Sequence, residues 1–357
     1  MKKLVVLCCL VLILTPTKIF ALGESASAIT IMDMDSNRVL YSKNQNAEKL
    51  IASITKIMTA IVAIESGKLD DVVVVDDAVL KAYGSGIYIE IGEEILLKDL
   101  VYGLMLRSGN DAALMIAKYV SGSVEEFAKN MNEKAEKIGM KNTTFYNPHG
   151  LDEETKNIST SYDMALLTSY AMKNEIYREI AGTKNYKVTT NKKSYVWKNK
   201  NKLLFTYEYT TGGKTGFTEH ARRTLVTTAS KNNMNIAVVT LNAPNDFKEH
   251  KEAYEYVFNN YTKYRVLNKK TFKVKNNKFD GRLYIKNDYY LLLKESETNK
   301  LNLNVKLEKN KNKIKNNVVG KVDVILDNKV IHTEKIYLER DEKKTEKKKG
   351  FFSWLFG

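Results

Sequence analysis

Apolar residues recur at helical spacing shortly after residue 50. Ile57, Met58, Ile61 and Ile64 fall on one face of a helix, so residues 52–65 are predicted to be helical with this face buried. We expect the chain to be organised around the first turn of this helix.

The same kind of pattern predicts most of the other elements in the first 260 residues. Helical periodicity predicts further helices at 97–107, from 110 onward, at 124–138, 162–172 and about 246–261. Alternating or β-branched runs predict extended segments at 28–34, 38–42, 72–75, 85–93, 210–218, 224–230 and 235–241. The turn cluster at 35–37 joins the first two extended segments into a hairpin.

The pattern changes near Tyr264. Residues 301–307 alternate strictly between apolar and polar, and two further apolar-rich runs, 321–326 and 330–338, flank a turn. No helical periodicity separates them, so we expect half-buried antiparallel strands that form a small β-sandwich.

Both ends of the chain carry targeting signals. Lys2 and Lys3 precede an eleven-residue apolar run, 4–14, which is typical of a secretory signal peptide with cleavage after Ala21. Ala26 and Ala28 are alternative cleavage points, and both cysteines lie within the apolar run. At the other end, charged residues 340–349 precede the aromatic and apolar segment 350–357. This composition predicts a peripheral anchor on an anionic membrane surface, too short to span it.

The net charge of +15 limits the expected partners. Removing Lys2, Lys3 and Lys18 with the signal leaves +12, which suits anionic lipids or wall polymers outside the cell. No basic motif interleaved with aromatic residues points to nucleic acid. The four histidines lack metal-ligand spacing, and His149 in the Pro-Gly loop is interpreted as a loop-structuring residue rather than a base. No metal or cofactor is therefore expected.

Ser53 and Lys56 are the first candidates for chemistry. They lie three residues apart at the start of the first helix, so the lysine amine can reach the serine hydroxyl. The helix dipole and burial both lower the pKa of such a lysine, which would let it activate the serine. The alternative is a capping serine followed by a solvated lysine.

Two further segments carry candidate polar residues. Ser108-Gly109-Asn110 lies between two predicted helices, either as a simple helix end and start or with Ser108 and Asn110 pointing into a cleft. Lys214-Thr215-Gly216 suits an edge strand that a ligand backbone approaches closely, and its spacing excludes a phosphate-binding loop.

Together, these three motifs resemble those of penicillin-binding proteins and class A β-lactamases. The chain is most similar to the low-molecular-mass penicillin-binding proteins, serine-type D-alanyl-D-alanine carboxypeptidases of peptidase family S11. The resemblance covers about residues 26–262 and includes the segments 26–28, 147–152 and 214–218. It implies an α+β fold, in which a β-lactamase/transpeptidase-like domain with a helical cluster on an antiparallel sheet precedes a small all-β domain. The expected division is 1–21 signal peptide, 22–262 peptidase domain, 263–339 β-rich domain and 340–357 linker and anchor.

The resemblance also assigns roles to the reacting groups. Ser53 would attack the carbonyl between the two terminal D-alanines of a peptidoglycan stem peptide, and Lys56 would take its proton. Ser108 would relay a proton to the leaving amine, and Asn110 would hold the substrate amide. The backbone N–H groups of Ser53 and Phe217 would form the oxyanion hole. β-Lactams would acylate Ser53 as substrate mimics.

The carboxylate site departs from the family pattern. Lys214, Thr215 and Gly216 would meet the terminal carboxylate, but Asp246 stands where many members carry an arginine. Our hypothesis is that Arg222 or Arg223 supplies the missing charge. The Ala-Arg-Arg-Thr sequence around them is similar to a branch from spore-forming Gram-positive bacteria, which suggests a role in the spore cortex.

Two rival functions share these motifs. A class A β-lactamase also needs a glutamate that deacylates the serine, and Glu153 and Glu154 lack the expected surrounding pattern. A wall-binding homologue that has lost catalysis would keep the fold, although the intact motifs argue against it.

Overall fold

The computed structural model describes residue 22 and residues 24–275, 277–308 and 314–340. The predicted signal peptide at 1–21 and the aromatic segment at 350–357 lie outside the described residues. Within the described ranges, no helix combines the length and hydropathy of a membrane-spanning segment.

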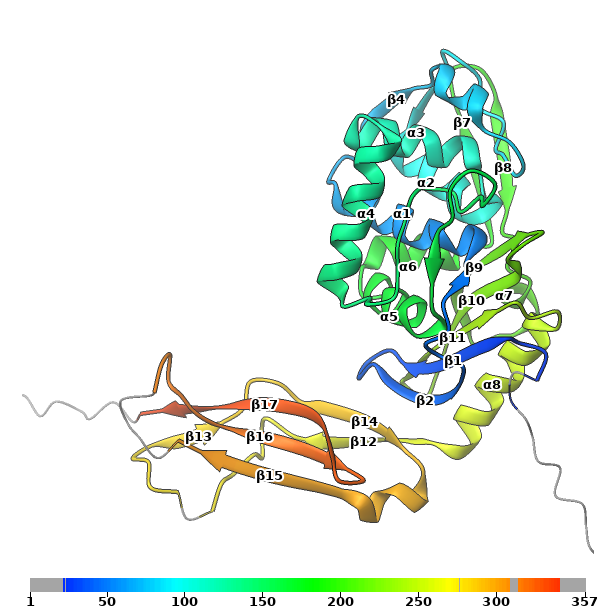
Figure 1. The fold of residues 1–357 in the computed structure, drawn as a ribbon. Helices are drawn as coiled ribbons and strands as arrows, with labels where there is room; N and C mark the ends of the chain where they lie inside the picture. The colour runs from blue at the N-terminus through cyan, green and yellow to red at the C-terminus, as the bar shows by residue number, and fades with distance from the viewer. Residues whose placement is uncertain (1–21, 23, 276, 309–313, 341–357) are drawn as a thin grey trace, which may run out of the picture.

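An antiparallel sheet of five strands forms the centre of the larger domain (Figure 1). Its order is β2-β1-β11-β10-β9, so β9 is an edge strand, as the sequence predicted. The bounds are β1 (Ala28–Asp33), β2 (Arg38–Lys43), β9 (Thr210–Thr218), β10 (Arg222–Lys231) and β11 (Met234–Leu241). All six residues of β1 are buried, because helices cover both faces of the sheet.

The helices lie mainly on one face of this sheet. They are α1 (Lys56–Glu65), α2 (Leu97–Arg107), α3 (Asn110–Ser121), α4 (Val124–Ile138), α5 (Ser161–Ala171) and α6 (Glu175–Gly182). The short α7 (Leu203–Thr206) contributes Leu203 to the core on the other face. Helix α5 packs on β1 and β11, whereas α8 (Asp246–Asn260) covers the opposite face over β10 and β11. Helix α1 contacts α2 to α6 and is buried along nearly its whole length. The larger domain is therefore built around α1, as expected.

Short pieces complete this domain. They are β3 (Lys49–Leu50), the 3-10 helices η1 (Ala52–Thr55) and η2 (Asp77–Lys81), β4 (Val72–Val74), β5 (Glu94–Leu96), β6 (Ile158–Ser159), β7 (Asn185–Thr189) and β8 (Ser194–Lys198).

Two local predictions need correction. The predicted helix at 52–65 is divided, because residues 52–55 form η1 and the α-helix begins at Lys56, so Ser53 is a first-turn residue of η1 and not an N-cap. Residues 85–93 do not form a strand, since carboxylates bind several of their N–H groups. Asp111 accepts from the N–H groups of Ile87 and Tyr88, at 3.0 and 2.6 Å, and Glu93 accepts from that of Glu90 at 2.9 Å.

The smaller domain consists of strands only, apart from the 3-10 helix η3 (Glu295–Lys300). Strands β13 (Arg282–Tyr284), β17 (Lys329–Glu339), β16 (Val318–Leu326) and β15 (Leu301–Leu307) form one sheet, in that order. Strands β12 (Thr262–Leu267) and β14 (Tyr289–Leu293) form a second sheet that packs on it through buried leucine and valine side chains. This arrangement agrees with the predicted sandwich, but the expectation that 301–307 is half-buried is wrong. Strand β15 is at the edge of its sheet, and its Leu303 and Val305 side chains are 50% and 38% exposed.

Polar contacts join the two domains. Lys263 Nζ lies 2.6 Å from a carboxylate oxygen of Asp35, in the β1–β2 turn. Arg38 donates to the Leu292 carbonyl and lies 2.5 Å from Glu297. Leu292 is fully buried in the core that α8 shares with the central sheet.

Candidate active site

Ser53 and Lys56 meet at the junction between η1 and α1. Residues three apart lie above one another in a 3-10 helix, so the turn aligns the two side chains. Lys56 Nζ lies 3.0 Å from Ser53 Oγ, 2.8 Å from Asn110 Oδ1 and 2.6 Å from the His149 carbonyl oxygen. The structure therefore brings together Ser53, Lys56 and Asn110 from three separate segments.

The surroundings of Lys56 favour its neutral form. Its side chain is fully buried, and burial is the main cause that holds its pKa well below the usual value, followed by the positive charges of Lys214 and Lys200. A neutral amine has two N–H donors and one lone pair. The Asn110 side-chain oxygen and the His149 carbonyl oxygen can only accept hydrogen bonds, so the two N–H groups of the Lys56 amine donate to them. This leaves the lone pair of the amine for the Ser53 hydroxyl.

Ser108 and Asn110 occupy the α2–α3 junction. Ser108 ends α2 in the left-handed conformation, with φ of 66°, and lines the cavity above Ser53. Asn110 is 2% exposed, and its amide nitrogen donates to the Tyr83 carbonyl at 2.6 Å while its oxygen accepts from Lys56. The junction is thus both a helix boundary and part of the site, and Asn110 orients Lys56.

Strand β9 borders Ser53 on the other side. A Cβ at Gly216 would lie 3.0 Å from the Ser53 nitrogen, so the two backbones run in close contact there. Lys214 is 1% exposed and donates to the Thr215 carbonyl at 2.7 Å. Its pKa is lowered to about 7, by burial first and then by Lys200. Phe217 is exposed at the mouth of the site.

The two arginines of β10 differ in position. Arg223 lines the cavity, and its guanidinium lies 2.7 Å from the carboxylate of the buried Asp246 and 5.7 Å from the centre of the Phe247 ring. Arg222 has a left-handed backbone with φ of 59° and is not among the lining residues.

These groups surround a cavity of about 300 Å³. It is lined by Ser53, Ser85, Ser108, Lys200, Lys202, Thr215, Gly216, Phe217, Arg223, Asp246 and Phe247. The sequence reasoning missed Ser85, Lys200 and Lys202. Lys200 donates to Ser85 at 3.0 Å, but it lies in the Lys-, Asn- and Tyr-rich stretch 185–209, whose composition predicts strands or a surface loop with a solvated face. No signal in that stretch distinguished Lys200 from its neighbours.

The loop that follows α4 packs against the first turn of α1, where its carbonyl groups accept hydrogen bonds. Asn147 accepts from the N–H of Gly150 at 2.6 Å, and Thr59 donates to the Pro148 carbonyl at 2.6 Å. His149 accepts from the Leu151 N–H at 3.1 Å, and burial lowers its pKa to about 3. Neutral His149 therefore stabilises the loop, in agreement with the loop-structuring interpretation.

Gly150 makes a close approach that predicts a strong effect of substitution. Its φ is 87°, and a Cβ there would lie 1.9 Å from the carbonyl oxygen of Ala52, next to Ser53. We expect Gly150→Ala to destabilise the protein by more than about 3 kcal/mol, since the φ cost of about 1–2 kcal/mol is joined by a clash with backbone. Thermal unfolding measures the effect. Gly122→Ala is the matched control, because its φ of 84° is similar and nothing lies within 4 Å of the added Cβ. If both variants lost the same amount of thermal stability, a clash at Gly150 would not be the cause of its loss.

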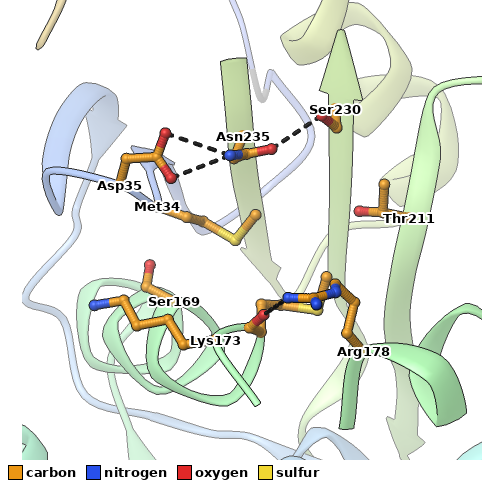
Figure 2. A pocket seen from close by; sticks show the side chains of 9 residues that line it. Met34, Asp35, Ser169, Lys173, Arg178, Thr211, Ser230 and Asn235 are labelled. Atoms are coloured by element: carbon orange, nitrogen blue, oxygen red, sulfur yellow. Dashed lines mark hydrogen bonds between the residues drawn. The ribbon is translucent and has the colours of Figure 1, made fainter. Parts of the chain in front are cut away.

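A second cavity, of about 400 Å³, lies between β1, α5, α6 and strands β9 to β11 (Figure 2). Its polar groups already bind one another: Asn235 donates to Asp35 at 3.1 Å and accepts from Ser230 at 2.9 Å. Arg178 donates to the Met172 carbonyl at 3.0 Å. Ser169 and Lys173 also line it, but the Ser169 hydroxyl donates to Met32 Sδ at 3.5 Å, and no hydrogen bond joins it to Lys173 in the described part of the chain. The cavity at Ser53, where lysine and serine are hydrogen-bonded, is therefore the candidate active site. The described residues contain no cluster of three or more His, Cys, Asp or Glu side chains that could hold a metal ion.

Comparison with known proteins agrees with this geometry. Residues 18–245 match the D-alanyl-D-alanine carboxypeptidase family, peptidase S11, and residues 261–344 match the C-terminal domain of penicillin-binding protein 5. The chain is similar to the D-alanyl-D-alanine carboxypeptidase DacF of Bacillus subtilis, 38% identical over 62% of this chain and 58% of that protein. It is also similar to DacC of Escherichia coli, 35% identical over 62% and 57%. The aligned part thus spans less than two thirds of these relatives. Penicillin-binding protein 5 of Haemophilus influenzae superposes with a TM-score of 0.76 and 26% identity, over 89% of this chain and 97% of that one.

Proposed function

The chain belongs to the D-alanyl-D-alanine carboxypeptidase family, peptidase S11, and on that premise we propose that it is a serine carboxypeptidase. Its substrate is the peptidoglycan stem pentapeptide, from which it removes the terminal D-alanine. One observation carries this proposal: the buried Lys56 amine lies 3.0 Å from Ser53 Oγ, and its pKa is well below the usual value.

The acylation step uses groups already in place. Ser53 Oγ attacks the carbonyl carbon between the two D-alanines while Lys56 takes the hydroxyl proton. The negative charge that develops on the carbonyl oxygen is held by the N–H groups of Ser53 and Phe217. The close approach of Gly216 to the Ser53 nitrogen supports this pairing.

Breakdown of the tetrahedral intermediate then releases D-alanine. The C–N bond breaks, and the proton passes from Lys56 through Ser108 to the leaving amine. Water hydrolyses the ester on Ser53 and returns the hydroxyl. A β-lactam acylates Ser53 in the same way but leaves a slowly hydrolysed adduct. The scheme requires no metal or cofactor.

The direct test uses the intact protein with two substrates. We expect release of D-alanine from a peptide that ends in D-Ala-D-Ala, and a one-to-one penicillin adduct that mass spectrometry locates on Ser53. An adduct on another residue would refute the assignment. Fast multiple turnover of a chromogenic cephalosporin would instead favour a β-lactamase. Against that rival, Glu153 and Glu154 are exposed and do not line the cavity.

Arg223 is proposed to take the place of the missing arginine in the carboxylate site. Asp246 and the Phe247 ring hold its guanidinium at the cavity that Thr215 also lines. We expect Arg223→Ala to lower kcat/KM for a D-Ala-D-Ala peptide about tenfold, mainly through KM, because a charged hydrogen bond contributes about 1.5–3 kcal/mol. Arg222→Ala is the matched control and should change kcat/KM less than twofold. If neither variant changes kcat/KM, the hypothesis is wrong.

The pKa of Lys214 predicts the alkaline side of the pH profile. Below about pH 7 its ammonium group can bind the substrate carboxylate, and above that pH it loses its charge. We therefore expect kcat/KM to fall as the pH rises above about 7, and kinetics from pH 5 to 9 measure this. Lys200→Gln removes a positive charge that lowers the Lys214 pKa, so the fall should move to higher pH. If kcat/KM of the Lys200→Gln variant falls at the same pH as that of the wild type, the titration of Lys214 is not the cause of the fall.

The site of action follows from the predicted ends of the chain. We propose that the protein is exported, acts at the outer face of the cytoplasmic membrane of a Gram-positive bacterium, and binds the anionic membrane surface through residues 350–357. Deleting those residues should move it from the membrane to the soluble fraction. A contribution to spore cortex maturation rests only on the sequence around Arg222 and Arg223.

A further inference from the structure

The excess positive charge lies almost entirely in the smaller domain. Residues 22–261 contain 29 Lys and Arg against 30 Asp and Glu, whereas residues 262–340 contain 20 against 9. The larger domain is therefore close to neutral, and the smaller domain carries a charge of +11. Such an asymmetry between domains points to a partner for the basic domain.

Three lysines lie side by side on the four-stranded sheet of this domain. Lys306 on β15 is directly opposite Lys321 on β16, which is directly opposite Lys335 on β17. Neighbouring strands are about 4.8 Å apart, and like charges directly opposite one another destabilise a sheet. Among the described residues a single carboxylate, Asp323, forms ion pairs with two of them, at 3.2 Å from Lys306 and 3.4 Å from Lys321. The fold alone gives no reason for this arrangement.

The face that carries these lysines is open to solvent. Val322, Val324 and Ile336 point to the opposite side, where they are fully buried in the core between the two sheets. Lys306, Lys321 and Lys335 are all exposed.

The same open face continues along the strands with aromatic and basic groups. Tyr284 and Tyr337 stack with ring centres 5.6 Å apart, and Lys286 lies 4.3 Å from the Tyr337 ring centre. Arg282 is paired opposite Glu339. We call the set Lys306, Lys321, Lys335, Lys286, Tyr284 and Tyr337 the lysine face.

We propose that the lysine face is a binding site for a linear polyanion with phosphate groups along its backbone. A row of lysines across neighbouring strands offers regularly spaced cations to such a chain, and charge complementarity identifies the class of ligand. This site is distinct from the cavity at Ser53 and does not depend on catalysis.

The position of the face favours a linear polymer. In Figure 1 the strands of the smaller domain run along its length, and β17 ends at the extremity remote from the larger domain. The lysine face lies on the open side of the sheet that β17 shares with β16 and β15, so its row of lysines crosses the side of the domain. A linear polymer can follow such a row, with one lysine on each of three neighbouring strands.

The test compares two triple variants of the full chain with labelled inorganic polyphosphate as the probe. One carries Lys306→Gln, Lys321→Gln and Lys335→Gln. The control carries Lys129→Gln, Lys141→Gln and Lys248→Gln, which remove the same charge from exposed positions of the larger domain. We expect Kd to rise about 10- to 100-fold for the first variant and less than twofold for the control, since a lysine at an anionic surface contributes about 1 kcal/mol. The dependence of log Kd on log salt should also lose about two to three units of slope.

Other outcomes would overturn the proposal. Equal weakening in both variants would mean that net charge alone binds the polymer. Unchanged polyphosphate binding, with loss of binding to phosphatidylglycerol vesicles, would make the face a membrane surface. The triple variant also removes both lysine partners of the buried Asp323, so its Tm is measured together with Kd. If the triple variant is unstable, Lys335→Gln alone, which keeps both lysine partners of Asp323, should raise Kd about fivefold.

All of these variants should release D-alanine from a short peptide at the wild-type rate. Failure of the polyanion proposal and failure of the proposed catalysis therefore remain separate results.

Discussion

Ser53→Ala is expected to abolish the penicillin adduct and to lower D-alanine release by about 10⁴-fold or more. The substitution removes the atom that forms the acyl bond, and loss of a nucleophile of this type leaves only the contribution of binding and the oxyanion hole. The fold should tolerate it, because the Ser53 side chain makes its one recorded hydrogen bond to Lys56, which keeps the oxygens of Asn110 and His149. Mass spectrometry and a D-alanine assay measure the two effects.

The control for this variant is another serine of the same helical region. Ser66 follows the last residue of α1 and donates to the Ala63 carbonyl at 2.7 Å, away from the cavity. Ser66→Ala should keep wild-type activity within about twofold. If Ser53→Ala released D-alanine at the wild-type rate, the nucleophile would have to be another residue.

Lys56→Gln is expected to lower both the penicillin acylation rate and kcat/KM by about 10³-fold. Glutamine can still donate to Asn110 and the His149 carbonyl, so the variant should fold, but its amide cannot accept a proton from Ser53. General base catalysis contributes about 10²–10⁴-fold, which sets the expected range. Stopped-flow acylation from pH 6 to 10 measures the loss. Raising the pH should not restore the rate, because the amide does not titrate.

Lys68→Gln is the matched control, since Lys68 lies just beyond α1 and does not line the cavity. Its amine donates to the Val120 carbonyl at 3.5 Å and lies 5.7 Å from the centre of the Tyr119 ring. Its acylation rate should equal that of the wild type. An Lys56→Gln variant that regained full activity at high pH would exclude Lys56 as the base. Lys214, with a pKa near 7, would then be the stronger candidate.

Arg223 and Asp246 illustrate how the carboxylate site differs from the usual pattern. The sequence placed an aspartate where an arginine was expected, which looked like a loss of positive charge. In the structure the buried Asp246 binds Arg223 and holds it at the cavity. The arrangement is consistent with an arginine supplied from β10 in place of one from α8, with the aspartate as its orienting partner.

Local pattern was sufficient for the regular elements. The periodicity of residues 97–107 and 124–138 predicted α2 and α4 with the observed bounds. The reason is that a helix with one buried face has apolar residues at every third or fourth position. The hairpin of β1 and β2 and three strands of the smaller domain, β15 to β17, followed from alternation and turn residues, and the glycines of β9 indicated its edge position. The strands β12, β13 and β14 were not predicted. The order of the three motifs was also enough to identify the family resemblance.

Only the tertiary structure decided how the site is assembled. The carbonyl of His149 and the side chain of Asn110 reach Lys56 from segments 93 and 54 residues away, and no local pattern encodes such contacts. Lys200 looked like one solvated lysine among many until folding placed it over Ser85. Residues 85–93 alternate as a strand does, but the distant Asp111 binds their N–H groups. The sequence by itself therefore determined most of the regular elements and the candidate reacting residues, whereas long-range packing decided the partners of those residues, the burial that lowers the pKa of Lys56, and the shape of the cavity.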